Sequence, residues 1–427
     1  MRTAYKFRLY PNKQQETMLD LTLETCRHLY NDALAARKKS WEAGEGIFSL
    51  PYNQQITCIK NKNQVYSQVL QNVLRRLDKS FLAAFGRVKT RKKQLEAKPA
   101  KKNPVKPGFP RFKSKNRYKS FTYPQSGFKI DGSRLTLSKI GSIRIFKHRE
   151  VQGKIKTCTL KRDSTGCWYV ILVTEIPDVP KKEGTLAIMA IGVDLGTVRQ
   201  KDPGTGNMVG RLATLSIGQM VLYPRFFVKT EERLKVAHLS LARKLPGSKN
   251  REEARVKLAK IHKKIRNQRD DFLHKKTRKL VNLANLIIFE RLQINGLSRG
   301  RNRSKDMHDH ALRKFVQFTT YKAERAGGSV EFVNPQSTSK ECSLCHKETK
   351  KYPGNRYPKC SNQECRLWIN RDHNAAINIL YRGLESRGII SQFDVLGHIY
   401  ENEDGTLGLR DCACIDLVEY DLCAGSF

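Results

Sequence analysis

Four cysteines in the last third of the chain limit its possible folds more sharply than any other local pattern. Cys342 and Cys345 are separated by two residues, and Cys360 and Cys365 by four. Two thiolate pairs at such spacings close a tetrahedral site around one Zn²⁺ ion. Because protein ligands would fill all four positions, we expect a structural zinc without a catalytic role. Four unrelated free thiols are the alternative, since the second pair is unusually wide.

The charge of the chain points to its partner. Its 427 residues include 81 Lys and Arg against 40 Asp and Glu, a formal net charge of +41. Each cationic side chain placed on a phosphate releases counterions, so we expect the chain to bind nucleic acid. Its length predicts two to four domains, at about 150 residues each. No apolar run approaches the roughly 18 residues of a membrane span, and the charged N-terminus lacks an apolar signal segment, so we expect a cytoplasmic protein without membrane contact.

The C-terminal tail, residues 391–427, differs from the rest of the chain. It holds eight acidic residues against Arg410, a net charge of −7, which leaves +48 for residues 1–390. The tail is interpreted either as a mobile segment that covers a basic face or as a dispensable extension. Its cysteines are read as free thiols, with a further metal site as the alternative: Cys412, Cys414 and Cys423.

Periodicity divides the first half into a sheet and a helical insert. Polar and apolar residues alternate over residues 5–9 and again over residues 133–176, where residues 163–166 (DSTG) predict a hairpin turn. Two helices are predicted between these strands, around residues 19–33 and 69–84, because apolar residues recur there on one face. We therefore expect an antiparallel, barrel-like β domain, joined by the first strand and interrupted by a helical domain.

A basic strap, defined as residues 87–119, follows the second helix. It holds 14 Lys or Arg residues and one acid, interleaved with prolines and with Phe109, Phe112 and Tyr118. This composition excludes a packed core. We interpret the strap as gripping a nucleic-acid backbone, with the aromatics stacking on bases, in preference to a merely solvated linker.

The second half follows an α/β layout. An apolar run over residues 186–193 predicts a strand that ends at Asp194, and further strands are predicted over residues 212–217, 220–223, 286–289 and 330–333. Helices are predicted over residues 231–244, 251–280 and 311–326. Residues 204–210 (GTGNMVG) resemble a phosphate loop but lack the Walker Lys-Ser/Thr, so we expect a flexible turn.

Three carboxylates are the candidates for catalysis. Asp194 and Glu290 each end an apolar strand, and Asp372 precedes a helical stretch. Taken singly, a strand-end Asp is often a turn former and Asp372 could be a helix cap. Brought together on one sheet edge of a cationic protein, they would offer the hard oxygen ligands that two Mg²⁺ ions need.

Several segments, in this order, resemble one known family. The segments are residues 191–196 (IGVDLG), 287–290 (IIFE), 342–345 (CSLC) and 371–378 (RDHNAAIN), supported by residues 8–11, 108–113, 271–275, 321–323 and 338–339. Together they resemble the split RuvC-like nuclease of TnpB proteins, which are transposon-encoded relatives of type V CRISPR effectors. The resemblance covers nearly all of residues 1–385.

The resemblance implies a fold and its domain boundaries. It implies a multidomain α+β protein in which a wedge-type β-barrel (1–11 and 106–182) contains an inserted helical recognition domain (12–105). An RNase H-like, RuvC-like α/β nuclease domain (185–336 and 367–390) would follow, interrupted by a zinc ribbon (337–366). The acidic tail (391–427) lies outside the resemblance.

The resemblance also implies an RNA-guided DNA endonuclease. The guide would be an RNA derived from the transposon right end, and the target would be double-stranded DNA beside a short flanking motif. The family's metal-binding carboxylates fall on Asp194, Glu290 and Asp372, and its zinc ligands on the four cysteines. Asp194 is expected to bridge two Mg²⁺ ions, with Glu290 and Asp372 each completing one shell. Candidate nucleic-acid contacts are Arg111, Lys113, Lys115, Arg117, Lys119 and Lys275.

Departures from the family pattern leave other functions open. Asn370 stands where many relatives have Asp, Lys340 replaces a common Gln, and residues 198–210 lengthen the turn after the first catalytic strand. We expect Asn370 to act through its neighbours, because Asp372 is present. An RNA-guided repressor that binds without cleaving, a compact CRISPR effector and a general zinc-ribbon DNA-binding protein are the alternatives. The last gives no account of the carboxylates.

Overall fold

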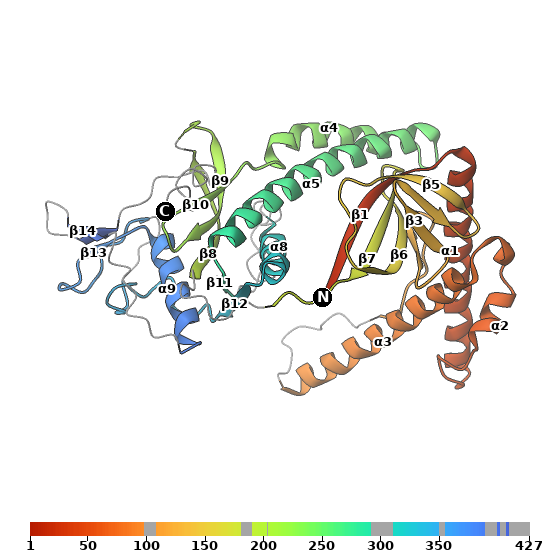
Figure 1. Ribbon diagram of the computed structural model, residues 1–427, viewed down its shortest axis with the longest axis horizontal. Helices are drawn as coiled ribbons and strands as arrows, with labels where there is room; N and C mark the ends of the chain where they lie inside the picture. The colour runs from red at the N-terminus through yellow and green to blue at the C-terminus, as the bar shows by residue number, and fades with distance from the viewer. Residues whose placement is uncertain are drawn as a thin grey trace. The chain divides into compact units, whose positions relative to one another are not determined.

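The computed structural model describes residues 1–97, 108–180, 190–202, 204–291, 311–349, 355–388, 399–401 and 407–409. The chain forms two compact units, an N-terminal unit (Met1–Asp178) and a C-terminal unit (Val179–Phe427). Both contain helices and strands (Figure 1), so the predicted multidomain α+β class is confirmed. Among the described residues, none of the helices combines the length and the apolar character needed to cross a membrane.

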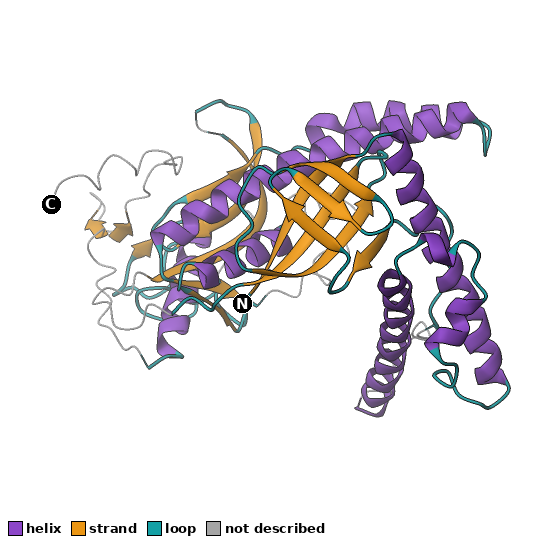
Figure 2. Cartoon of the chain, turned by 45° about the vertical axis from the view of Figure 1, so that its right-hand side comes forward, coloured by secondary structure: helices purple, strands orange, loops and turns teal. Residues whose placement is uncertain are grey.

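A curled antiparallel sheet forms the N-terminal unit together with helices (Figure 2). Its strands are β1 (Arg2–Tyr10), β2 (Ser120–Tyr123), β3 (Phe128–Asp131), β4 (Arg134–Leu137), β5 (Gly141–Phe146), β6 (Lys154–Arg162) and β7 (Trp168–Glu175). They lie in the order β2-β6-β7-β1-β5-β4-β3, so the predicted barrel is an open half-barrel with β2 and β3 at its edges. The N-terminal strand β1 joins this sheet as predicted, and alternate residues Tyr5, Phe7 and Leu9 are buried.

Helices fill the insert between β1 and β2. They are α1 (Lys13–Glu42), α2 (Tyr52–Thr57), the short 3₁₀ helix η1 (Lys62–Gln64) and α3 (Ser67–Ala97). Asn12 begins α1 with a capping box, in which its side chain accepts from the Gln15 N–H and the Gln15 side chain accepts from the Asn12 N–H. The predicted apolar faces of α1 and α3 are confirmed, and they pack on the half-barrel in one core. Helix α3 extends to Ala97, well into the strap, and residues 98–107 lie outside the described range.

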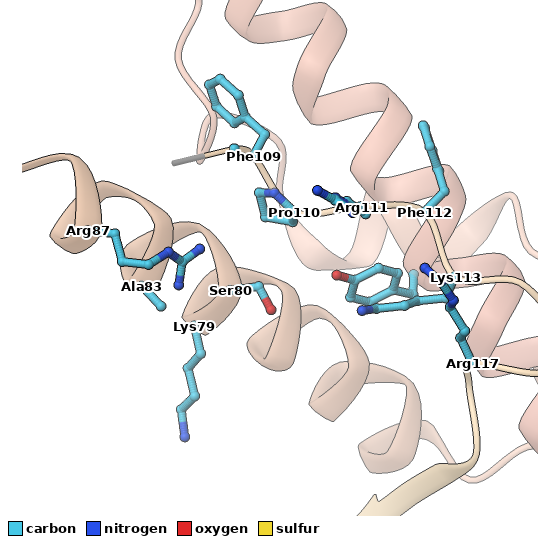
Figure 3. Close-up of a pocket in the computed structure, with 12 residues that line it drawn as sticks. Lys79, Ser80, Ala83, Arg87, Phe109, Pro110, Arg111, Phe112, Lys113 and Arg117 are labelled. Carbon is cyan, nitrogen blue, oxygen red and sulfur yellow. The ribbon is translucent and has the colours of Figure 1, made fainter. Parts of the chain in front are cut away.

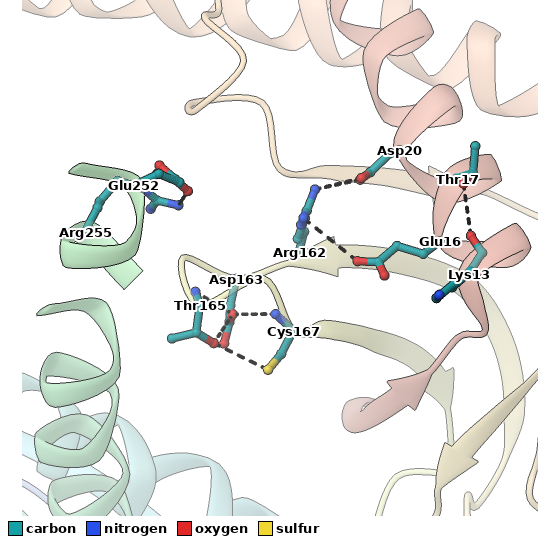
Figure 4. Close-up of polar contacts among 10 residues, drawn as sticks. All are labelled: Lys13, Glu16, Thr17, Asp20, Arg162, Asp163, Thr165, Cys167, Glu252 and Arg255. Carbon is teal, nitrogen blue, oxygen red and sulfur yellow. Dashed lines mark hydrogen bonds and ion pairs between the residues drawn. The ribbon is translucent and has the colours of Figure 1, made fainter. Parts of the chain in front are cut away.

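The predicted hairpin turn at residues 163–166 is confirmed. The Asp163 carboxylate accepts hydrogen bonds from the backbone N–H groups of Thr165 (2.9 Å) and Cys167 (3.1 Å), as Figure 4 shows. Beside the turn, Arg162 of β6 forms an ion pair with Asp20 of α1 at 2.8 Å. The turn is thus shaped by a local side chain, and the strand before it is tied to the helical insert.

The C-terminal unit is built on a mixed five-stranded sheet. Its strands are β8 (Ala190–Lys201), β9 (Met208–Leu215), β10 (Met220–Tyr223), β11 (Leu286–Glu290) and β12 (Ser329–Val333), in the order β10-β9-β8-β11-β12. Strands β8, β11 and β12 are parallel, and β9 and β10 are antiparallel to their neighbours. The predicted α/β layout is confirmed.

Two details of this sheet correct the sequence prediction. Strand β8 does not end at Asp194 but continues to Lys201, because a shift of register between Leu195 and Val198 lets it pair with β9 beyond Gly196. Strand β9 begins at Met208, so the last three residues of the expected flexible turn at 204–210 belong to a strand. The bulge interrupts the alternation of polar and apolar residues, which is why the pattern did not reveal the longer hairpin.

Helices cover both faces of the mixed sheet. They are α5 (Lys249–Leu283), α8 (Leu312–Arg325) and α9 (Arg371–Glu385). Helix α4 (Glu231–Ala242), which follows the 3₁₀ turn η2 (Val228–Thr230), packs on α5 instead. Ile287 and Phe289 of β11 pack in one core with α5 and α8, whereas Leu286 and Ile288 pack with α9. Burial on both faces explains why β11 is continuously apolar.

Helix α9 lies unusually close to the sheet at two glycines. A Cβ atom on Gly192 of β8 would lie 2.2 Å from the Ala376 carbonyl oxygen of α9. A Cβ atom on Gly383 of α9 would lie 2.4 Å from a side-chain carbon of Ile288. A side chain at Gly192 would therefore require movement of the helix backbone, and one at Gly383 would require movement of the helix or of the buried Ile288 side chain.

A third, small sheet involves part of the tail. Strand β13 (Leu367–Trp368) pairs with β15 (Leu407–Leu409), which pairs with β14 (Ile399–Glu401). These six tail residues therefore form strands beside the cysteine segment. The three tail cysteines, Cys412, Cys414 and Cys423, lie outside the described residues.

Candidate functional site

The three candidate carboxylates come from separate parts of the C-terminal unit. Asp194 lies in β8 and Glu290 ends the adjacent parallel strand β11, each one residue beyond the paired residues Val193 and Phe289. Asp372 lies in the first turn of α9. Parallel pairing explains why the two strand carboxylates meet at one edge of the sheet.

All three carboxylates line one cavity of about 240 Å³, called the carboxylate cavity below. The structure therefore brings together residues that are up to 178 positions apart in the sequence. Among the described residues, the four cysteines are the only group of three or more His, Cys, Asp or Glu whose ligand atoms all lie within 4.8 Å of one another. The carboxylates thus surround a space and do not touch one another as a compact cluster. Their oxygen atoms are the donor type that Mg²⁺ prefers.

Asn370, and not Asp372, caps helix α9. The Asn370 side-chain oxygen accepts from the N–H groups of Asp372 (3.0 Å) and His373 (3.4 Å). The cap alternative considered for Asp372 is therefore wrong, and its carboxylate is left to face the cavity. Its place in the first helical turn favours negative charge there, because the helix dipole is positive at that end.

Two arginines that sequence reasoning missed contact Asp372. Arg211 of β9 forms an ion pair with the Asp372 Oδ2 atom, and the Arg356 Nη1 atom lies 3.4 Å from the same oxygen. The Arg211 side chain is 4 % exposed and also lines the cavity. The sequence did contain one signal for Arg211, namely a charged residue within an otherwise apolar stretch. Burial of an unpaired charge is costly, so such a residue is expected to have a partner of opposite charge.

Burial also acts on Glu290. It raises the pKa of this carboxyl above its usual value, and the nearby Arg382 guanidinium acts in the opposite direction. A raised pKa means that the site stabilises the charged form less well than water does, and a cation bound nearby would act in the opposite direction.

The remaining wall of the cavity includes residues from the segment that precedes the cysteines. Thr338 and Ser339, part of the family resemblance, line the cavity together with Thr214 of β9. Thr338 is buried, and its carbonyl oxygen accepts from the Asn378 side chain of α9 at 2.9 Å. The motif therefore connects the cavity wall to the helix that carries Asp372.

The four cysteines form a cluster whose geometry fits a zinc ion. The Sγ atoms of Cys342 and Cys365 are 3.6 Å apart, as are those of Cys345 and Cys360. Tetrahedral coordination at the usual Zn–S length of about 2.3 Å places sulfur atoms roughly 3.8 Å apart. The wide spacing of the second pair does not prevent this arrangement, and the alternative of four unrelated thiols is not supported.

The cysteine segment is tied to helix α9 by two asparagines. The Asn374 side chain donates to the Glu341 carbonyl (2.7 Å) and accepts from the Ser343 N–H (2.9 Å). The Asn378 side chain also donates to the Glu341 carbonyl, at 2.9 Å. Both asparagines are buried, so these bonds are protected from water. The cysteine cluster and the helix that bears Asp372 therefore hold each other in place.

A separate basic groove lies in the N-terminal unit. It has a volume of about 550 Å³ and lies between α3 and the strap (Figure 3). Five cations and no acid line it: Lys79, Arg87, Arg111, Lys113 and Arg117. The strap is held to α1 by Asn31, whose side chain accepts from the Lys113 N–H (2.8 Å) and donates to the Lys113 carbonyl (3.0 Å). A fixed strap with solvent-exposed cations suits a polyanion.

The strap aromatics do not share one role. Tyr118 is buried in the core, so the predicted stacking on bases does not fit it. Phe109 packs edge-on against Phe81 and Phe85 of α3, at 6.2 and 6.3 Å between ring centroids, and anchors the strap. Phe112 is half-exposed, and the Lys38 Nζ atom lies over its ring, 5.1 Å from the centroid.

The other predicted contact residues lie outside the groove. Lys115 is exposed and Lys119 is half-buried in the same strap, but neither lines it. Lys275 is on α5 of the C-terminal unit, where it is exposed and pairs with Asp271 at 3.0 Å. Of the predicted contact residues, Arg111, Lys113 and Arg117 therefore line one groove, and Lys275 belongs to the other unit.

Two other segments of the family resemblance, residues 271–275 of α5 and residues 321–323 of α8, lie where these helices pack together. The Lys322 Nζ atom of α8 donates to the His274 carbonyl (2.6 Å) and to the Thr277 hydroxyl (2.7 Å) of α5. Burial lowers the pKa of Lys322 to about 8. This lysine satisfies neutral oxygen atoms between helices and takes no part in the carboxylate cavity.

Family models match three stretches of the chain. They are described as "Cas12f1-like, TNB domain" (residues 313–379), "Probable transposase" (residues 205–301) and "Helix-turn-helix domain" (residues 1–46). The first covers the whole cysteine cluster and Asp372, and the second includes Arg211 and Glu290. In the third range the structure has strand β1 followed by the single long helix α1.

Similar proteins cover most of the chain. "Putative RNA-guided DNA endonuclease InsQ" of Escherichia coli K12 is 30 % identical over 409 residues, 89 % of this chain and 92 % of that protein. "Putative RNA-guided DNA endonuclease" of Streptomyces pristinaespiralis is 29 % identical over 90 % of both chains. "TnpB-like protein L79" of Acanthamoeba polyphaga mimivirus is 23 % identical over 90 % of this chain and 74 % of the other. A solved structure, the "Cas12f1-sgRNA-target DNA complex", matches 89 % of this chain and 98 % of that chain at 14 % identity, with a TM-score of 0.44.

Proposed function

The chain belongs to the TnpB family of RNA-guided DNA endonucleases, related to Cas12f effectors, and from this premise we propose that it cuts target DNA beside a short flanking motif by Mg²⁺-dependent phosphodiester hydrolysis. One observation carries the proposal. Asp194, Glu290 and Asp372, which come from two strands and a helix, line a single cavity. Protein packing alone gives no reason to gather three carboxylates at one sheet edge.

We assign the domains that the family resemblance implies to parts of the two units. We assign the half-barrel (1–11 and 106–182) as the wedge domain and the inserted helices (12–105) as the recognition domain. The mixed sheet with α9 (185–336 and 367–390) is the RuvC-like nuclease, and the cysteine segment (337–366) is its zinc ribbon. The tail (391–427) is assigned to none of these domains, although its strand β15 pairs with β13.

The carboxylate cavity suits a metal-dependent cut. Asp194, Glu290 and Asp372 would hold two Mg²⁺ ions, which supply an activated water and stabilise the departing 3′ oxygen when bound. The chain itself fixes the three carboxylates: β8 and β11 set the first two side by side, and the Asn370 cap orients the start of α9. A single zinc ion in the cysteine cluster would keep the ribbon and α9 together.

The basic groove is proposed to hold the backbone of a guide RNA or of the flanking duplex. Its exposed cations offer phosphate contacts, and Phe112 offers one stacking surface. The guide would be derived from the transposon right end, and pairing between guide and target would supply most of the sequence specificity.

A non-cutting repressor is the competing function. It would be favoured by the loss of a metal-binding carboxylate, and here all three line the cavity. Use by a CRISPR array would leave the mechanism unchanged.

The test is to purify the protein from cells that carry its native downstream flank and to sequence the bound RNA. The complex is then given Mg²⁺ and plasmids that bear the guide-matched target beside a randomised flank. Guide-dependent breaks beside one motif, absent in Asp194→Ala, support the nuclease. Bound guide RNA and tight target binding without breaks would support the repressor instead.

A further inference from the structure

Arg211 and Arg356 approach the same oxygen of Asp372, but from different surroundings. Arg211 is 4 % exposed, whereas Arg356 is 47 % exposed. Because water screens an exposed guanidinium far more than a buried one, Arg211 exerts the stronger field on this carboxylate. The Asp372 Oδ2 atom is also one of the oxygens that the proposed function assigns to a divalent cation.

We propose that the Arg211 guanidinium competes with a divalent cation for Asp372 and thereby sets how tightly the carboxylate cavity binds metal. This inference rests on the proposed metal-dependent function. A divalent cation on this oxygen would be repelled strongly by the buried Arg211 guanidinium, and less by Arg356, whose charge is screened by solvent. A metal ion can therefore bind Asp372 only if the Arg211 side chain moves away from this carboxylate, or with an affinity lowered by repulsion from the Arg211 charge.

The strands around Arg211 are irregular in a way that directs this side chain. On the β8 side the register passes from Leu195 opposite Ala213 to Val198 opposite Arg211. On the β10 side it passes from Val221 opposite Ala213 to Leu222 opposite Arg211, which leaves Leu212 without a partner there. Bulges re-aim side chains next to active sites.

The effect of these irregularities is visible in the cavity lining. Residues 211 and 214 are three positions apart, so a regular strand would place their side chains on opposite faces. Arg211 and Thr214 nevertheless line the same cavity. The irregular backbone of β9 therefore directs the Arg211 side chain into the carboxylate cavity, whereas a regular strand would direct it to the other face of the sheet.

A merely structural ion pair explains the arrangement less well. The neighbours of Arg211 along β9 are apolar and buried, so an apolar residue at this position would pack without the cost of a buried charge. Lys322 shows the contrasting case, since its buried charge meets neutral oxygen atoms and lies between helices.

Mn²⁺ is a suitable probe, because its free and bound forms are distinguished by electron paramagnetic resonance. The full-length, zinc-loaded protein without RNA is titrated with Mn²⁺ as wild type, Arg211→Met, Arg211→Lys and Arg356→Met. We expect Arg211→Met to bind Mn²⁺ about ten-fold more tightly than the wild type. Arg211→Lys should stay near the wild type because it keeps the charge, and Arg356→Met should shift affinity less than Arg211→Met.

The double variant Arg211→Met with Asp372→Asn should lose the gain in affinity, since the competition acts through Asp372. Equal Mn²⁺ affinity in the wild type and Arg211→Met would overturn the role of Arg211, even if guide-dependent cleavage is intact. Absence of Mn²⁺ binding in every variant would refute the metal-dependent function itself, and the inference with it. Circular dichroism and zinc content verify that each variant is folded, and a misfolded Arg211→Met is replaced by Arg211→Gln.

Discussion

The basic groove and the carboxylate cavity differ in the sign of their charges, in their size and in the origin of their lining residues. The groove is open and is lined by five cations, three of them from one short stretch of the strap. The cavity is less than half as large and takes its carboxylates from three separate elements. Solvent screens the cations of the groove, whereas Asp372 in the cavity forms an ion pair with a buried arginine, Arg211.

This difference predicts how sensitive each site is to the substitution of one residue. Phosphate contacts add up, so under the proposed function each cation in the groove would carry a modest share and a neighbour could replace it. A metal site needs particular oxygen atoms in fixed positions, so none of its carboxylates can be replaced. We therefore expect substitutions to have graded effects in the groove and all-or-none effects in the cavity.

The largest expected effect belongs to the cavity. Asp194→Ala should lower the cleavage rate by at least about a thousand-fold, because losing a metal ligand removes several kcal/mol of transition-state stabilisation. Guide-RNA and target binding should stay within about two-fold of the wild type, since the groove is unchanged. Single-turnover cleavage and filter binding measure the two quantities. Retained cleavage would contradict the assignment of Asp194.

The next effect joins the cysteine cluster to the cavity. Cys345→Ser should release zinc and lower cleavage strongly, because structural zinc supplies folding free energy to the ribbon that Asn374 and Asn378 tie to α9. Zinc content and hydrogen exchange of α9 measure the two consequences. Cys58→Ser is the matched control, as Cys58 is an exposed free cysteine outside the cluster. Normal exchange of α9 in the zinc-free variant would show that the two parts are independent.

Substitutions in the groove should produce a smaller and graded loss. The triple variant Arg111→Ala, Lys113→Ala, Arg117→Ala should reduce the salt slope of RNA binding by about two to three, with each single variant losing roughly one. Affinity measured at several salt concentrations gives the slope. The charge-keeping variant Arg111→Lys with Arg117→Lys serves as control. An unchanged slope in the triple variant would move the nucleic-acid contact elsewhere.

The smallest effect concerns a buried cation that serves packing. The folded-state pKa of Lys322 is lowered to about 8 by burial, so between pH 8 and its ordinary value of 10.5 the unfolded chain holds a proton that the folded chain has released. Wild-type stability should therefore rise relative to Lys322→Met over this interval, by on the order of 2 kcal/mol. Urea unfolding at a series of pH values measures it. Mn²⁺ affinity should not change, in contrast to Arg211→Met.

Much of the fold was predictable because its signals are local. The strand over residues 5–9, the faces of α1 and α3 and the apolar strand β11 each follow from periodicity within one segment. Spacing alone also indicated the cysteine cluster. Strands β2 and β3 were missed, since both lie before residue 133, where the recognised alternation of polar and apolar residues begins.

The candidate site was only partly predictable. Glu290 was recognisable from the end of an apolar strand and Asp194 from the end of an apolar run, and the family resemblance indicated all three carboxylates. Arg211 and Arg356 were not, because their meeting with Asp372 depends on a bulged register and on the path of the cysteine segment. Tyr118 was misassigned because an aromatic in a basic segment looks the same in sequence whether it is buried or exposed.

The two glycines beneath α9 have a consequence for how this protein can evolve. Gly192 lies two residues before Asp194, and Gly383 lies on the helix that carries Asp372. A methyl group at Gly192 would collide with the backbone of α9 and lift the helix, together with its carboxylate, from the sheet, and one at Gly383 would displace the helix or the buried Ile288 side chain. In a library of single variants selected for cutting, these two positions should therefore be as depleted of substitutions as the carboxylates themselves, although neither glycine has a side chain to contribute to the reaction.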